Sequence, residues 1–186
     1  MISCFKGTFK VTSPRGYRTF NGQKEYHGGI DMVALGTDKN VYAIADGKVD
    51  ATPYEANGFG YYIRQLLPDG KRIYYGHLKS GSISVKAGQA IKIGDKLGAM
   101  GSTGNSTGAH THIELRVKGT SRESLDISEL TGIPNKIGIY ETTTISPIEA
   151  MNKIKEKCGF ENQTIDYLKK YKYSDDLFIK LWKAME

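Results

Sequence analysis

Two histidines separated by one residue, His110 and His112, are the part of this sequence best suited to chemistry. They follow a glycine-rich polar stretch at residues 101–108, and residues 111–118 alternate in the manner of a strand. Successive strand side chains point to opposite faces, so the two imidazoles lie side by side on one face. The chain has only four histidines, and a hydrophobic core needs no such pair. The pair therefore points to metal binding or proton transfer.

A second candidate site is the segment His27-Gly28-Gly29-Ile30-Asp31. In a straight strand, residues four apart would lie about 13 Å from each other, too far to share a metal ion. Two glycines permit a sharp bend, which can bring an imidazole and a carboxylate to the ~2 Å ligand distances of zinc. With His112 as the third ligand, the sequence predicts one zinc ion whose fourth position is left to water, as in catalytic zinc sites.

The two remaining histidines, His77 and His110, are candidates for acid and base. If the three segments converge, both rings lie near the water on the zinc ion. Zinc lowers the pKa of its bound water to around 7, and histidine titrates in the same range. One ring can take the proton from water, and the other can donate to the oxyanion that forms when hydroxide attacks an amide carbonyl. The predicted reaction is peptide hydrolysis by zinc-bound water.

The elements that must position these residues are short runs of alternating or β-branched residues separated by glycines. Nearly all of the 22 glycines precede Ser146. This pattern predicts a mainly β fold, an antiparallel barrel or sandwich built from hairpins. The turn Pro68-Asp69-Gly70 joins two strands into a hairpin that ends at His77. The predicted strands are residues 8–12, 41–45, 48–51, 61–66, 72–75 and 111–118.

The composition changes after about Thr131. Residues 139–145 form a threonine-rich connector, which we interpret as a last strand or a linker. Residues 146–149, Ser-Pro-Ile-Glu, match a helix start with a capping box, and apolar residues at helical spacing continue to the end of the chain. We predict a catalytic domain at 1–145 and a helical segment at 146–186 that packs on it or binds the cell wall or a partner.

Composition and charge narrow the partners. A hydrophobic content of 39% and a charged content of 25% are typical of a soluble globular protein, and no run approaches the roughly 18 apolar residues of a membrane span. The net charge of +6 comes without a basic helix or an aromatic-rich basic patch, so nucleic acid is not indicated. An anionic cell-wall polymer is a possible partner. Residues 1–6 lack the apolar stretch that a secretory signal requires. We therefore predict that the chain is made in the cytoplasm.

The histidine motifs resemble those of the lysostaphin-type (M23) zinc endopeptidases, which cut peptidoglycan cross-links. The resemblance covers most of the chain up to about residue 117, with motifs at residues 11–14, 27–31, 41–49, 75–78, 103–108 and 110–112. It implies that His27, Asp31 and His112 bind zinc. It also implies that His77 and His110 are catalytic.

Two positions depart from the family pattern. Arg15 stands where phenylalanine is usual before a glycine, and Thr111 stands where leucine is common between the histidines. Neither residue is a ligand, so the predicted zinc site is unaffected. The departures can change contacts with the substrate, and the family's substrate specificity therefore does not carry over directly. The tail matches no wall-binding module, whereas similar helical tails are familiar from phage lysins.

We therefore predict a zinc endopeptidase that hydrolyses peptide bonds in bacterial peptidoglycan and acts on the cell wall as a phage or prophage lysin or a virion-associated enzyme. The bond lies either between glycines or between D-alanine and a diamino acid. The competing prediction is a catalytically inactive wall-binding or regulatory module on the same fold. A phosphocarrier of the sugar phosphotransferase type would also suit glycine-rich hairpins with two adjacent histidines, but it leaves Asp31 without a role.

Overall fold

The structure is a computed structural model, and it describes residues 1–20, 22–117, 123–142, 154–159, 181 and 185. The chain divides into two compact units, Met1–Thr143 and Thr144–Glu186. The first unit carries all four histidines. In the second, residues 154–158 are helical, whereas the predicted helix start at 146–149 and most of the later predicted helical residues lie outside the described part.

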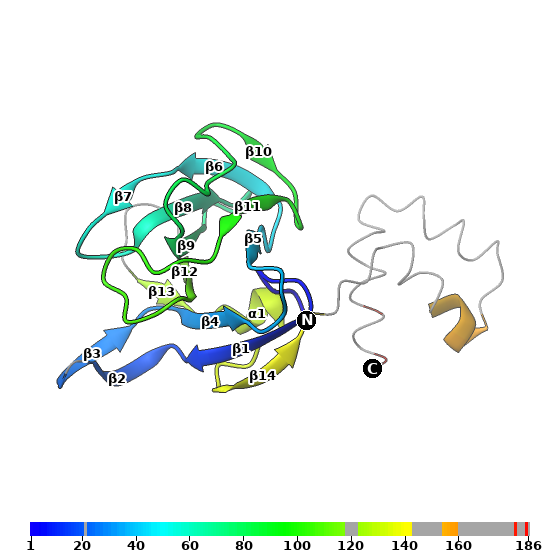
Figure 1. The fold of residues 1–186 in the computed structure, drawn as a ribbon. Helices are drawn as coiled ribbons and strands as arrows, with labels where there is room; N and C mark the ends of the chain where they lie inside the picture. Colours follow the sequence, from blue (N-terminus) through cyan, green and yellow to red (C-terminus); the bar gives the residue numbers. More distant parts are fainter. Residues whose placement is uncertain (21, 118–122, 143–153, 160–180, 182–184, 186) are drawn as a thin grey trace. The chain divides into compact units, whose positions relative to one another are not determined.

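Short strands and one short helix make up the first unit (Figure 1). Their bounds are β1 (Thr8–Ser13), β2 (Gly16–Phe20), β3 (Gln23–His27), β4 (Ile30–Ala34), β5 (Asn40–Tyr42), β6 (Gly47–Ala51), β7 (Tyr54–Glu55), β8 (Gly60–Leu66), β9 (Arg72–Leu78), β10 (Ala90–Ile91), β11 (Lys96–Ala99), β12 (Thr111–Arg116), β13 (Ser124–Leu125), α1 (Ser128–Thr131) and β14 (Gly138–Glu141). The predicted mainly β, antiparallel fold is confirmed.

One large antiparallel sheet holds most of these strands, in the order β10-β6-β8-β9-β12-β4-β1-β14, with β13 beside β12 and β7 beside β8. Two smaller sheets pair β11 with β5 and β2 with β3. The β2–β3 hairpin extends away from the large sheet (Figure 1). Because β12 lies between β9 and β4, the strand with His112 separates the strand with His77 from the strand with Asp31.

Alternation along β12 divides its side chains between the core and the site. Ile113 and Leu115 join the hydrophobic core, so the residue before each of them, His112 and Glu114, faces the other side. Strand β1 shows the same period, with Phe9 buried between exposed neighbours. Each large apolar side chain removed from water stabilises the fold by roughly 2 kcal/mol, and this burial fixes the register that orients the histidines.

Most predicted strands fall within observed ones. Residues 8–12, 48–51, 61–66 and 72–75 lie within β1, β6, β8 and β9. The strand predicted at 41–45 ends earlier, because Ala43 hydrogen-bonds with loop residues, donating its N–H to the Asp95 carbonyl at 2.9 Å. The first part of the connector forms β14, and its residues from 143 onward lie outside the described part.

The sequence did not predict the β2–β3 hairpin or α1. The hairpin strands carry mostly exposed or half-buried residues, so they lack the apolar alternation that marks a strand facing a core. Helix α1 has four residues, ending at Gly132 in the left-handed conformation with φ 71°, and is too short to produce a helical period.

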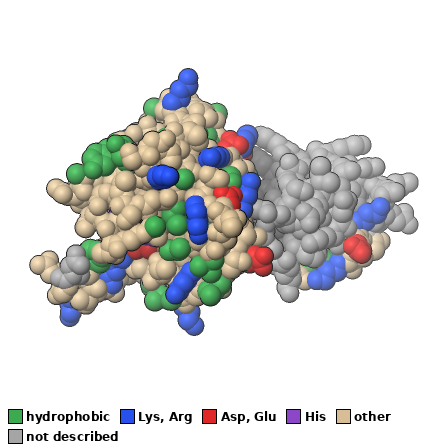
Figure 2. All heavy atoms as spheres, viewed as in Figure 1, with side chains coloured by type: hydrophobic (Ala, Val, Ile, Leu, Met, Phe, Trp, Pro, Cys, Tyr) green, Lys and Arg blue, Asp and Glu red, His purple; other side chains and the backbone are tan. Residues whose placement is uncertain are grey.

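The surface shows no concentration of one charge on the face in Figure 2, where lysine and arginine side chains lie among hydrophobic and acidic ones. Among the described residues, no helix is long and apolar enough to span a membrane.

Candidate metal centre

The turn between β3 and β4 brings the first motif against β12. Gly28 and Gly29 form this turn, and neither has a positive φ. A Cβ on Gly29 would lie 2.2 Å from the Ile113 carbonyl oxygen and 2.7 Å from His112 Nε2. A Cβ on Gly28 would lie 2.7 Å from Glu114 Oε1. These glycines are therefore required for room, because the backbone here runs in contact with β12.

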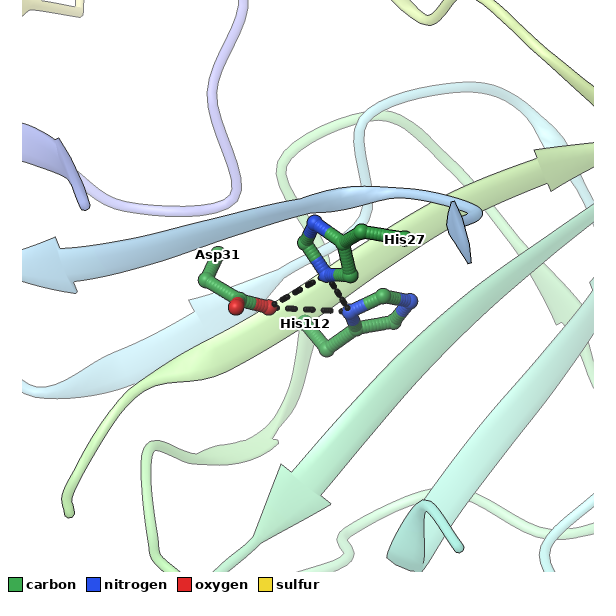
Figure 3. A group of neighbouring side chains, drawn as sticks. All are labelled: His27, Asp31 and His112. Carbon is green, nitrogen blue, oxygen red and sulfur yellow. Dashed lines mark hydrogen bonds and ion pairs between the residues drawn. The ribbon is translucent and has the colours of Figure 1, made fainter. Parts of the chain in front are cut away.

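Three side chains, from the end of β3, from β4 and from β12, meet at one point (Figure 3). His27 Nε2 lies 3.1 Å from Asp31 Oδ1 and 2.9 Å from His112 Nδ1. His112 Nδ1 lies 2.9 Å from the same carboxylate oxygen. The strand register accounts for this meeting, since His112 is paired directly with Asp31. All three residues are buried.

The three atoms fit a tetrahedral zinc ion. Ligands at about 2.0 to 2.2 Å from zinc are separated from one another by about 3.3 Å, and the observed separations of 2.9 to 3.1 Å need to widen by only a few tenths of an ångström. Two imidazole nitrogens and one carboxylate oxygen are a donor set that zinc accepts, with a fourth position left over.

Hydrogen bonds on the far side of each ring fix which nitrogen is free. His27 Nδ1 lies 2.8 Å from the Pro14 carbonyl oxygen, and His112 Nε2 lies 3.2 Å from Glu114 Oε2. Both partners can only accept, so these nitrogens carry the ring protons. The nitrogens that face Asp31 are therefore the ones that would give their lone pairs to a metal ion, and without a metal they can carry the protons that hydrogen-bond to Asp31 Oδ1.

Glu114 is a buried carboxylate that the sequence analysis did not single out. Arg116 donates to it from Nε at 2.7 Å and from Nη2 at 3.3 Å. Burial opposes its ionisation, but the hydrogen bonds from His112 and Arg116 outweigh burial and lower its pKa. Its carboxylate therefore holds His112 in place. The alternation His110-x-His112-x-Glu114 places all three residues on one face and could have indicated this role.

Arg18 on β2 binds the other oxygen of Asp31. Its Nη1 donates to Asp31 Oδ2 at 3.0 Å and to Ser13 Oγ at 2.8 Å, while its Nε donates to Glu25 at 2.7 Å. These bonds turn Oδ1 of Asp31 toward the imidazoles and tie the β2–β3 hairpin to the site. Burial opposes ionisation of Asp31, but hydrogen bonds with His112 and His27 hold its pKa below the usual range.

His77 and His110 lie beside each other next to the three-residue cluster. Their ring centroids are 4.6 Å apart, and His110 Nε2 is 3.6 Å from Asp31 Oδ1. The loop before β12 supplies both Nδ1 partners at 2.8 Å, the carbonyl of Thr103 for His77 and that of Gly108 for His110. Burial, together with the neighbouring histidines, lowers the pKa of His77 to about 4, so this ring is uncharged at neutral pH.

All five residues singled out in the sequence border one open cleft of about 560 Å³. Residues 18–20 of β2 and residues 105–109 of the loop before β12 form further parts of its wall. A volume of this size is in the range of ligand-binding clefts. The arrangement provides a metal site, two proton-transfer groups and space for a substrate.

Comparison with known proteins agrees with this site. The model of Peptidase family M23 matches residues 25–124, which include all five of these residues. The chain belongs to peptidase family M23. Family M23 consists of metallopeptidases, so this chain is a metallopeptidase by family, and the predicted resemblance is confirmed.

Relatives of this M23 chain include enzymes of two specificities. It is 37% identical over 109 residues to peptidoglycan DD-endopeptidase ShyC of Vibrio cholerae, covering 58% of this chain and 24% of the relative. It is 38% identical over 96 residues to glycyl-glycine endopeptidase ALE-1 of Staphylococcus capitis, covering 50% and 25%. The chain thus spans about a quarter of the length of these relatives.

A solved structure shows the same fold. The catalytic domain of lysostaphin from Staphylococcus simulans superposes with a TM-score of 0.55 and 31% identity, covering 64% of this chain and 89% of that domain. The similarity therefore extends over nearly the whole of that domain.

Proposed function

We propose that this M23 chain is a zinc-dependent endopeptidase that hydrolyses peptide bonds in bacterial peptidoglycan. The observation that carries the proposal is the meeting of His27 Nε2, Asp31 Oδ1 and His112 Nδ1 within 2.9 to 3.1 Å of one another beside two further histidines in one cleft. The peptidoglycan endopeptidases among its relatives support the substrate class.

In this proposal His27, Asp31 and His112 are the zinc ligands. Zinc, when bound, would polarise the scissile carbonyl and acidify water. Pro14, Glu114 and Arg18 keep the ligand atoms aimed at one point through the hydrogen bonds described above.

His77 and His110 are the proposed proton-transfer pair. Each ring donates its Nδ1–H to a backbone carbonyl, which leaves Nε2 as a proton acceptor. Between them, the two rings can accept the proton released by the attacking water and return it to the amine that leaves. The low pKa of His77, about 4, leaves its Nε2 unprotonated at neutral pH.

Release of new amino groups from purified cell walls tests the proposal. We expect release by the wild-type chain, its loss with a chelator and its recovery with zinc. His110→Ala should abolish release and still bind one zinc ion per chain. A catalytically inactive wall-binding or regulatory module would sediment with walls and release nothing, and loss of zinc from His110→Ala would instead place His110 among the ligands.

The bond that is cut can be identified by mass spectrometry of digested walls. The relatives include a DD-endopeptidase and a glycyl-glycine endopeptidase, so walls with direct cross-links and walls with glycine bridges are both needed. Fragments from only one wall type would fix the specificity of this chain.

We infer that the chain acts at the cell wall, with residues 1–145 as the catalytic domain and 146–186 as a helical segment. Its net charge of +6 supports contact with an anionic wall polymer. Deleting residues 147–186 distinguishes two roles for the segment, since insolubility indicates packing, whereas a soluble enzyme that no longer sediments with walls indicates targeting. Origin as a phage or prophage lysin stays a prediction.

A further inference from the structure

The backbone of His77 has an unusual conformation. Its φ is 59°, and it is the only described residue other than glycine with a positive φ. Such a conformation is strained for a residue with a side chain and persists only where the surroundings hold it. One restraint is the His77 N–H, which donates to the Phe59 carbonyl at 2.7 Å. This bond fixes the backbone but leaves the ring free to rotate.

A second restraint acts on the ring and comes from Thr103. Its carbonyl accepts the Nδ1–H of His77 at 2.8 Å. Its hydroxyl donates to the Leu78 carbonyl at 2.7 Å and accepts the N–H of Tyr61 at 3.0 Å. The side chain thus joins the start of β8 to the end of β9, and the backbone of the same residue holds the imidazole.

The contact between this loop and β8 is too close for other side chains. Gly60 has φ 64°, and a Cβ there would lie 2.3 Å from the Thr103 carbonyl group and 2.4 Å from its hydroxyl. A Cβ on Gly104 would lie 2.2 Å from the Gly60 nitrogen. Two groups hold the loop here, the Asn105 N–H, which donates to the Gly58 carbonyl at 2.9 Å, and the Thr103 hydroxyl, which is the side-chain group in the residue whose carbonyl holds His77. Removing the hydroxyl would leave the Leu78 carbonyl and the Tyr61 N–H without this partner.

We propose that Thr103 is a positioning residue whose hydroxyl fixes His77 as the Nδ1–H tautomer with Nε2 as the proton acceptor. The inference rests on the proposed function, in which His77 transfers a proton. The glycine-rich stretch at residues 101–108 thereby has a role, since the carbonyl of its Thr103 sets the tautomer of the His77 ring beside the metal centre.

The test compares Thr103→Val, which keeps the shape but removes the hydroxyl, with Thr103→Ser, which keeps the hydroxyl, in the full chain. Nitrogen-15 NMR reports the tautomer of His77, with the signal assigned from His77→Gln. We expect wild type and Thr103→Ser to hold the Nδ1–H tautomer and Thr103→Val to populate both. We also expect kcat to fall on the order of tenfold in Thr103→Val, with KM and zinc affinity within about twofold, and Thr37→Val, an exposed control, to match wild type.

Several results would overturn the proposal. These are a wild-type His77 in the Nε2–H tautomer, an unchanged tautomer and kcat in Thr103→Val, or a Thr103→Ser variant as impaired as Thr103→Val. If Thr103→Val does not fold, Thr103→Ala, which also lacks the hydroxyl, takes its place in the comparison with Thr103→Ser. The NMR readout needs no activity, so a wild-type chain that releases no amino groups would refute the proposed function and leave the role of Thr103 to be judged by the tautomer.

Discussion

Replacing Glu114 with glutamine should weaken zinc binding without removing a ligand. The carboxylate accepts three hydrogen bonds, one from His112 at 3.2 Å and two from Arg116 at 2.7 and 3.3 Å. An amide has one accepting oxygen and one donating nitrogen. If the oxygen faces Arg116, the amide NH₂ meets the Nε2–H of His112. That ring must then move its proton to Nδ1, the atom that is needed for zinc.

The size of the effect follows from this conflict. Loss of an outer partner of a metal-binding histidine typically costs about 10- to 100-fold in metal affinity, which corresponds to about 1.4 to 2.7 kcal/mol. At saturating zinc, the gain in unfolding free energy on adding the metal should fall by the same amount. Glu129→Gln, an exposed glutamate in α1, is the matched control and should leave both quantities unchanged.

Calorimetric zinc titration of the metal-free proteins measures the affinity, and urea unfolding with and without zinc measures the stabilisation. A Glu114→Gln chain with wild-type zinc affinity would refute the reasoning that this carboxylate sets the tautomer of His112. The unfolding curve without zinc separates two roles of this carboxylate. If metal-free Glu114→Gln is already unfolded, Glu114 contributes to folding rather than to metal binding.

Three further predictions test other parts of the site. Gly29→Ala should lower the unfolding free energy by about 2 kcal/mol or more, because its Cβ would lie 2.2 Å from a carbonyl oxygen. The control Gly36→Ala, where a Cβ meets open space, should change this free energy by no more than about 0.5 kcal/mol. Equal urea midpoints for the two variants would contradict the prediction. In the folded chain the pKa of His77 is about 4, below its ordinary value of 6.5, so the unfolded state binds more protons and gains stability as the pH falls between these values. The metal-free His77→Gln protein should therefore lose less stability than wild type between pH 7 and 4.5 in urea unfolding, and equal losses would contradict this prediction. Asp31→Asn should abolish stoichiometric zinc binding in metal analysis, because a neutral amide replaces the charged ligand, and one retained zinc per chain would exclude Asp31 as a ligand.

The sequence was most informative where chemistry and periodicity coincide. The alternation at residues 110–114 determines which side chains share a face, and this face is opposite the core residues Ile113 and Leu115 in the structure. The sequence predicts that Gly28 and Gly29 allow His27 and Asp31 to meet, and in the structure these two side chains lie 3.1 Å apart. The physical reason differs in part, since the structure shows contact with β12 where the sequence suggested a bend alone.

The supporting residues could not be predicted because their partners are distant in sequence. Arg18 reaches Asp31 across 13 residues, and Thr103 reaches His77 across 26. Neither pairing produces a local pattern, because each depends on strand order and register. The β2–β3 hairpin that carries Arg18 is mostly exposed, so hydrophobic periodicity gives no signal for it.

The proposed function depends on one zinc ion bound by His27, Asp31 and His112. Diffraction from crystals of the zinc-loaded chain, recorded on both sides of the zinc absorption edge, tests it most directly. We expect a single anomalous peak about 2.0 to 2.2 Å from His27 Nε2, Asp31 Oδ1 and His112 Nδ1. A peak at another site, or one bound through His110 in place of any of the three, would contradict it.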